Sequence, residues 1–263
     1  MRRYNAVDGR RNGQRELVWG SADFEQASNL AWRSATAGFG ATFAKALTSH
    51  ADRRAVRAVL MAPVTTVRLR AEEAARLRED VPVVGRCLFP NRRSQLAQFV
   101  LDVPATEAEY LAGKHRQALR TNLNHAADAG IKCERVVCYD DWRGVVEGVL
   151  LQRDLADRRM LEALRPPTPP HRVLLYAAKD ACERPVAVAA TAAFGELSCL
   201  LFAISSPHHR GGLWALNAFF ALDCASDGVR YLTVGSALRD GRGCQYLAHR
   251  LGYRVRNIRF VSR

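Results

Sequence analysis

The segment from Phe99 to Ile131 constrains the fold most strongly, because it carries the signals of a strand, a loop and a basic helix in succession. Pro104 ends the strand, since proline has no amide hydrogen to donate to a β-ladder. Thr106 is the expected N-cap before an acidic first turn, and Gly130 is the expected left-handed stop. Apolar residues recur between them at helical spacing: Leu111, Ala118, Leu119, Leu123 and Ala126. The pattern predicts an amphipathic helix over 111–129, whose basic face is either a solvated surface or a binding surface.

Length and composition indicate a folded protein with a sizeable core. The chain has 263 residues, 48% of them hydrophobic, and lacks the run of about 18 apolar residues that a transmembrane helix needs. The basic start, MRRYNAVDGRRNGQREL, has no apolar stretch typical of a secretory signal, so we expect a cytoplasmic protein. Seven cysteines are scattered without a C-x-x-C pair, which favours reduced thiols and predicts no metal site.

The formal net charge of +13, from 39 basic and 26 acidic residues, favours a polyanionic partner. We consider tRNA, a nucleotide pyrophosphate or an anionic membrane surface. The first candidates for nucleic-acid contacts are Lys114, Arg116 and Arg120 on the basic helix. A second patch is Arg254, Arg256 and Arg259 on the tail, whose alternation predicts an edge strand with a basic face. Arginines on an edge strand also have a simpler explanation, since they discourage aggregation.

The chain divides into three parts by pattern. Residues 1–20 are expected to form a basic arm, and residues 99–263 a larger unit. Residues 21–98 are expected to form a small N-terminal α/β lobe, and one interpretation is that this lobe is a degenerate half-copy of the larger unit. Within the lobe we expect helices over 24–32 and 71–77 and strands over 56–61 and 81–88.

The larger unit shows a definite order of elements after its first helix. A strand over 132–138 is followed by helices from Asp140 or Asp141 to Leu151 and over 154–164, and then by a proline-rich loop. The remaining elements are strands over 172–178, 186–194 and 197–204, a helix over 213–225, a strand over 231–234, a helix over 244–250 and the basic strand.

Four pieces of this unit resemble the GNAT acyltransferase fold. They are the basic helix, the strand Arg184-Pro-Val-Ala-Val-Ala189, the turn His208-His209-Arg210-Gly211-Gly212-Leu213 before a helix, and Leu251-Gly252-Tyr253 before the last strand. The helix is similar to the one that opens the acyltransferase-like domain of Fem-type peptidyltransferases, which use aminoacyl-tRNA. The resemblance implies an α/β (α+β) fold with a mixed, mostly antiparallel sheet flanked by helices. It also implies that strand 197–204 splays from strand 231–234.

The resemblance places an active site around the glycine turn. Arg210, Gly211, Gly212 and Leu213 would hold a donor phosphate at a helix N-terminus, beside Ser205 and Ser206 at a strand end. In GNAT acetyltransferases such a loop holds the CoA pyrophosphate; here the spacing departs from that pattern, and the glycines also suit a simple turn. Candidates for proton transfer are His208, His209, Tyr246, Ser236 and Asp240. A packed core position is the alternative for Tyr246.

These observations favour an acyltransferase that forms an amide by moving an aminoacyl group from aminoacyl-tRNA to an amine of a small molecule or peptide. It would need no cofactor beyond this co-substrate. One alternative is an acyl-CoA-dependent N-acetyltransferase. Another, of a different class, is a non-catalytic nucleic-acid-binding protein that uses the same basic surface.

Overall fold

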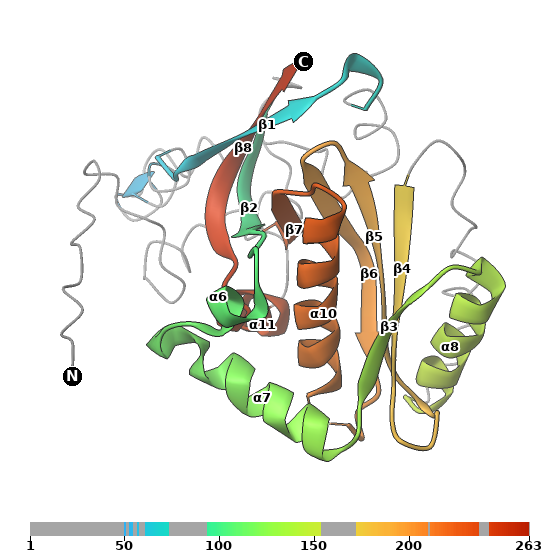
Figure 1. The fold of residues 1–263 in the computed structure, drawn as a ribbon. Helices are drawn as coiled ribbons and strands as arrows, with labels where there is room; N and C mark the ends of the chain where they lie inside the picture. The colour runs from blue at the N-terminus through green and yellow to red at the C-terminus, as the bar shows by residue number, and fades with distance from the viewer. Residues whose placement is uncertain are drawn as a thin grey trace.

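The computed structural model describes residues 61–73, 94–153, 172–209, 211–236 and 242–262, and positions 50, 53, 54 and 57. In this part of the chain, eight strands form one twisted sheet in the order β1-β8-β2-β7-β6-β5-β4-β3 (Figure 1). The strands are β1 (Val64–Leu69), β2 (Ser94–Asp102), β3 (Lys132–Val136), β4 (Arg172–Lys179), β5 (Pro185–Phe194), β6 (Leu197–Ser205), β7 (Tyr231–Ser236) and β8 (Arg254–Ser262). The helices are α6 (Glu107–Leu111), α7 (Gln117–Asp128), α8 (Tyr139–Leu151), α10 (Gly212–Ser226) and α11 (Arg242–Arg250), with a 3-10 turn η1 (Lys114–Arg116).

Most strand pairs are antiparallel, and only β1 with β8 and β6 with β7 run parallel. Helices cover both faces of the sheet. Helix α10 packs on one face against alternate residues of β4 and β5, such as Tyr176 and Ala189, and α8 packs on the other against Ala177 and Val188. The predicted fold class, a mixed and mostly antiparallel sheet flanked by helices, is therefore confirmed.

Both predicted ends of the basic helix are confirmed, but the helix is interrupted. The Thr106 hydroxyl accepts from the Glu109 amide at 3.2 Å, and Gly130 has a φ of 64°. Between them, Gly113 takes a φ of 89° and separates α6 from η1 and α7. The apolar spacing alone did not reveal this break, because Leu111 and Leu119 face the core in both arrangements.

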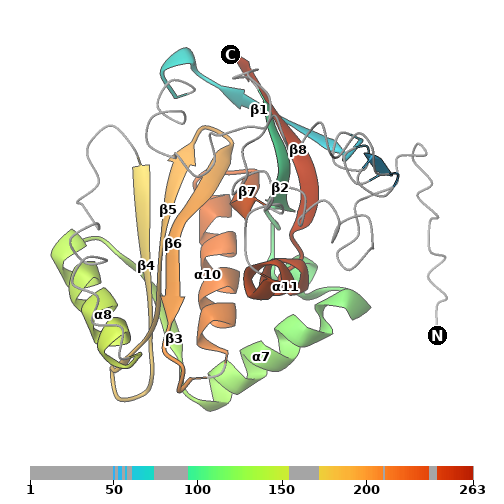
Figure 2. The same ribbon diagram turned by 180° about the vertical axis from the view of Figure 1, so that it is seen from behind.

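The last strand was wrongly predicted to lie at an edge. Strand β8 pairs with β2 on one side and with β1 on the other (Figure 2). Strand β1 was not predicted, although its alternation buries Thr65, Val67 and Leu69. The strand expected over 56–61 is also wrong, since Arg57 is helical and Met61 lies in a turn. The expected elements over 24–32, 81–88 and 154–164 lie outside the described residues.

Helix α10 connects the end of β6 to β7, and α7 crosses beneath its N-terminal end (Figure 1). Its buried residues are apolar almost throughout, which removes enough apolar surface from water to fix the helix on the sheet. This packing holds the N-terminus of α10 beside the end of β6, where the candidate site lies. No helix among the described residues is long and apolar enough to cross a membrane.

Candidate active site

The central feature of the candidate site is the point where β6 and β7 separate. Their parallel ladder covers only Leu197–Cys199 on β6, whose last rung pairs Cys199 with Thr233. Beyond it β6 continues to Ser205 and β7 to Ser236. The predicted splay of these strands is therefore present, and it leaves one edge of β6 without a strand partner among the described residues. Backbone N–H and C=O groups on that edge are available to a ligand.

A bulge in β6 lies directly after the last rung. Ala190 of β5 pairs with Phe202 and Thr191 pairs with Leu200, so Leu201 is an extra residue on β6. Its side chain is 44% exposed. A bulge redirects the backbone locally and is common beside active sites. Burial raises the pKa of the neighbouring Cys199 thiol to about 12, so this thiol stays protonated at neutral pH and is a poor nucleophile.

The two glycines of the predicted turn are buried in contacts between elements. Gly211 has a φ of 85° and N-caps α10, and a Cβ there would overlap the carbonyl oxygen of Asn122 on α7. A Cβ on Gly212 would overlap Cγ1 of Val186 on β5. Both glycines therefore permit close packing of α10 against α7 and β5. The next two residues of α10, Leu213 and Trp214, are only half-buried.

The end of β6 is fixed by hydrogen bonds around the predicted serines. The Ser206 amide donates to Val186 O at 2.7 Å, and its hydroxyl accepts from the His208 amide at 3.2 Å. The Ser205 carbonyl accepts from Arg153 at 2.8 Å. Both serines thus lie at the turn that leads into α10, and the Ser206 hydroxyl shapes that turn.

The two predicted histidines differ in environment. The side chain of His208 is exposed, whereas His209 lies with its Nε2 atom 3.8 Å from the Asp180 carboxylate. Asp180 closes the β4–β5 turn by accepting from the Cys182 and Arg184 amides at 2.9 and 3.0 Å. The Arg184 guanidinium donates to it as well, and these bonds hold the pKa of the carboxyl below its usual range. Asp180 thereby also places a negative charge next to His209.

The other predicted catalytic residues are more dispersed. Ser236 ends β7, across the splay from β6, and pairs in register with Gln98. Tyr246 on α11 is 42% exposed, so the core position considered for it is wrong, and Arg250 stacks 5.2 Å above its ring. Arg210 and Asp240 lie outside the described residues.

The predicted nucleic-acid contacts fall into three kinds. Lys114, Arg254 and Arg259 are exposed. Arg256 instead binds both oxygens of Asp102, at 2.8 and 2.5 Å, and Arg120 donates to the carbonyls of Leu111 and Gly113 at 2.6 and 2.8 Å. Arg116 is half-buried beneath the end of α11. The basic helix therefore does not present its three cations as one solvated row.

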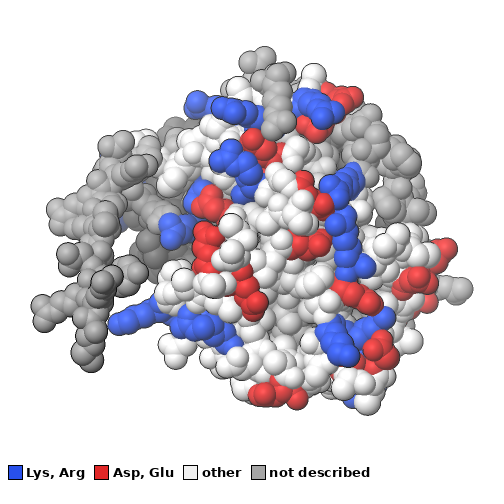
Figure 3. Space-filling model, in the orientation of Figure 1, with Lys and Arg blue, Asp and Glu red and all other residues white. Residues whose placement is uncertain are grey.

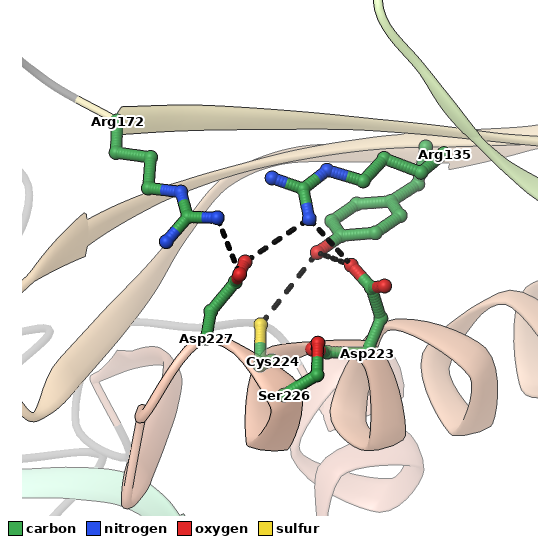
Figure 4. Close-up of polar contacts among 7 residues, drawn as sticks. Arg135, Arg172, Asp223, Cys224, Ser226 and Asp227 are labelled. Carbon is green, nitrogen blue, oxygen red and sulfur yellow. Dashed lines mark hydrogen bonds and ion pairs between the residues drawn. The ribbon is translucent and has the colours of Figure 1, made fainter.

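A polar network at the opposite end of α10 anchors this helix to the sheet (Figure 4). Arg135 of β3 and Arg172 of β4 both bind Asp227, and Arg135 also lies 3.4 Å from Asp223. The Tyr176 hydroxyl donates to Asp223 at 2.9 Å. The cations offset the placement of two carboxylates at a helix C-terminus, which is otherwise unfavourable. The network lies at the closed end of the β6–β7 splay and serves to position α10.

Charges of both signs are interspersed over much of the face in Figure 3, and a group of Lys and Arg side chains gathers where α7 begins.

Among the described residues, no group of three or more His, Cys, Asp or Glu side chains is placed to hold a metal ion.

No family profile and no curated protein matches the sequence. Several solved structures are similar in fold. The C-terminal domain of a candidate lysylphosphatidylglycerol synthetase from Agrobacterium fabrum has 15% identity and a TM-score of 0.42, covering 61% of this chain and 58% of that one. L-PGS from Bacillus licheniformis has 13% identity and a TM-score of 0.43, with 68% and 64% covered. A GCN5-related N-acetyltransferase from Kribbella flavida has 15% identity and a TM-score of 0.37, with 65% and 59% covered. This chain therefore spans about three fifths of the length of each.

Sequence reasoning missed several residues that the fold brings together. The strand from Leu201 to Ser206 was expected to supply backbone N–H groups, but the bulge at Leu201 gave no sequence signal, because a bulge depends on the register of two strands. Tyr110, His115, His249 and Tyr253 surround Arg116 and were not selected. The adjacency of His115 to Arg116 and the motif Leu251-Gly252-Tyr253 were the signals that could have pointed to them.

Proposed function

We propose that this protein is a GNAT-like acyltransferase that forms an amide bond at the β6–β7 splay, with an aminoacyl-tRNA as donor. The observation that carries the proposal is the bulge at Leu201, placed where β6 loses its partner, on the strand that leads to the N-terminus of α10. Backbone N–H groups fixed in this way stabilise the oxyanion that develops when a carbonyl is attacked.

The reaction requires few side chains. The nitrogen of a neutral amine attacks the ester carbonyl carbon of the donor, a C–N bond forms, and the C–O bond to the ribose breaks. The proton lost by the amine nitrogen is transferred to the departing ribose oxygen, and His208 or His209 relays it. The acceptor is an amine of a small molecule or peptide, bound on the β7 side of the splay.

The choice of donor rests on charge and on the glycine turn. The net charge of +13 suits an RNA with many phosphates. Gly211 and Gly212 are occupied by packing against α7 and β5, which weakens the case for a loop that cradles the pyrophosphate of CoA. An acyl-CoA donor is therefore the second choice.

The test is incubation of the full chain with a mixture of aminoacyl-tRNAs and, separately, with acyl-CoAs, each with and without a pool of amines. We expect amine-dependent deacylation of tRNA and a new amide in the product mixture. If only acyl-CoA is consumed, the donor is acyl-CoA and not aminoacyl-tRNA. If tRNA binds without losing its aminoacyl group, the non-catalytic alternative is favoured.

A further inference from the structure

The guanidinium of Arg116 occupies a notch at the end of α11 that only a glycine leaves open. Gly252 follows the last turn of α11 with a φ of 90°, and a Cβ on it would overlap Nη1 of Arg116. The guanidinium carbon lies 5.0 Å from the centre of the Tyr110 ring. The Tyr110 hydroxyl donates to Leu251 O at 3.0 Å, so this tyrosine contacts the guanidinium with its ring and the end of α11 with its hydroxyl.

The buried polar atoms in this notch lack partners among the described residues. Nη1 of Arg116 is buried and makes no hydrogen bond, and the same holds for the hydroxyl of Tyr253, a residue that is only 1% exposed. Burial lowers the pKa of Arg116 and raises that of Tyr253. An unpaired cationic donor in such a place costs free energy that a bound acceptor would recover.

Basic side chains from three elements lie around Arg116. His115 precedes it in η1, Arg254 begins β8, and His249 and Arg250 end α11. Burial and these neighbouring cations lower the pKa values of His115 and His249, and no carboxylate contributes to any of the three shifts at His115, Arg116 and His249. The Nε atom of Arg250 is also buried without a hydrogen-bond partner among the described residues. We call His115, Arg116, His249, Arg250 and Arg254 the Arg116 cluster.

The partial negative charge at the C-terminus of α11 explains only part of this arrangement. A helix C-terminus favours a nearby cation, but this effect alone does not account for three guanidinium groups, those of Arg116, Arg250 and Arg254. It also leaves Nη1 of Arg116 without an acceptor. A bound anion would accept hydrogen bonds from these open donors.

We propose that the Arg116 cluster is a discrete binding site for a phosphate group of the donor substrate. Guanidinium groups match phosphate oxygens with paired hydrogen bonds, and the neutral imidazoles of His115 and His249 each add one N–H donor. This assignment deepens the proposed function, on which its physiological source rests. It separates Arg116, which faces an anion site, from Arg120, whose guanidinium is occupied by the carbonyls of Leu111 and Gly113.

The site is within reach of the splay. Helix α7 runs from Arg116 to Asn122 and Ala126, which contact Gly211 at the start of α10. At 1.5 Å per residue this separation is roughly 9–15 Å. One extended donor can therefore place a phosphate at the Arg116 cluster and its acyl group near the end of β6.

The experiment uses inorganic pyrophosphate as the probe, titrated calorimetrically into the full chain at low salt. We expect saturable binding that weakens as salt rises. Arg116→Gln should weaken it roughly ten- to hundredfold, as expected for a lost charged hydrogen-bond donor. Gly252→Ala keeps every charge but fills the notch, and it should weaken binding to a similar extent. Arg116→Lys should retain part of the affinity, because it keeps the charge and loses the planar fork.

The matched control is Arg143→Gln on α8, which removes one positive charge from the opposite face of the sheet and should leave pyrophosphate affinity unchanged. Thermal melting confirms that each variant is folded. Absence of pyrophosphate binding, or equal affinity in wild type, Arg116→Gln and Gly252→Ala, would overturn the site. A third outcome is an adventitious ion only, in which pyrophosphate binds equally weakly to Arg143→Gln and Arg116→Gln. This outcome would overturn the proposed site as well.

Competition identifies the source of the phosphate. Deacylated tRNA should displace pyrophosphate from the wild type but not from Arg116→Gln, whereas displacement by coenzyme A alone would assign the site to the other donor. A chain that binds pyrophosphate through Arg116 but deacylates no aminoacyl-tRNA would keep the site and reject the proposed function.

Discussion

Gly212 and Val186 lie so close that α10 and β5 meet without room for a methyl group between them. Gly212 has no positive φ, so its backbone would accept alanine and only packing forbids it. The contact fixes the N-terminus of α10 against the strand that pairs with β6. The position of this helix end relative to the splay therefore depends on one missing side chain.

We expect Gly212→Ala to destabilise the protein by about 1–3 kcal/mol, the usual cost of overpacking. Adding Val186→Ala should recover part of this loss in the double variant, because it removes the overlapping Cγ1 atom. Gly144→Ala on α8 is the control; its Cβ meets nothing within 4 Å, and it should stabilise by about 0.5–1 kcal/mol. Denaturant unfolding of the wild type, the single variants Gly212→Ala, Val186→Ala and Gly144→Ala, and the double variant measures these effects. Equal effects of Gly212→Ala with and without Val186→Ala would contradict the packing role.

Leu201 tests the transfer site. Leu201→Pro removes the amide hydrogen of the bulge residue, a position where proline is tolerated, and Leu201→Ala keeps it. If this amide stabilises the oxyanion, the proline variant should lose about 10²–10³ in kcat with little change in KM, since a single oxyanion donor has this effect. The alanine variant should remain close to wild type. Steady-state amide formation measures both, and equal rates in the two variants would remove the Leu201 amide from the mechanism.

We expect the Arg120 side chain to stabilise the fold. Its guanidinium holds the carbonyls of Leu111 and Gly113, so Arg120→Gln should lower the free energy of unfolding by about 1–2 kcal/mol. The exposed pair of Arg143 with Glu147 provides the comparison, where Arg143→Gln should cost no more than about 0.5 kcal/mol. Chemical denaturation distinguishes the two. A neutral Arg120→Gln variant would show that these carbonyls are satisfied equally well by water.

Asp180 should make stability depend on acid pH. Its pKa in the folded protein lies below the ordinary value of 3.8, first because of the Arg184 hydrogen bond. The stabilisation is therefore complete above about 3.8, and it is lost as the pH falls through the lower folded value. Asp180→Asn should be less stable than wild type at pH 7, and the difference should shrink toward pH 3. Urea unfolding across this range checks it, and a difference that grows on acidification would have the wrong sign.

The local elements were largely readable from the chain. The cap at Thr106 and the stop at Gly130 depend on residues within one turn of the helix, so the sequence carries them directly. The alternation of strands and amphipathic helices after Lys132 likewise predicted β3 to β7 and their flanking helices within a few residues. The break at Gly113 escaped because the apolar positions on either side of it still face one core.

The local elements and the excess of positive charge follow from the sequence alone, since both depend on near neighbours and on composition. Tertiary structure alone decided which cations are available. It placed β8 inside the sheet, where Arg256 pairs with Asp102, and it brought Arg116 against Gly252 from a distant part of the chain. The bulge at Leu201 was also decided there, because strand register is a property of two strands together. Contacts between residues far apart in sequence leave no periodic signal, and the candidate site is made of such contacts.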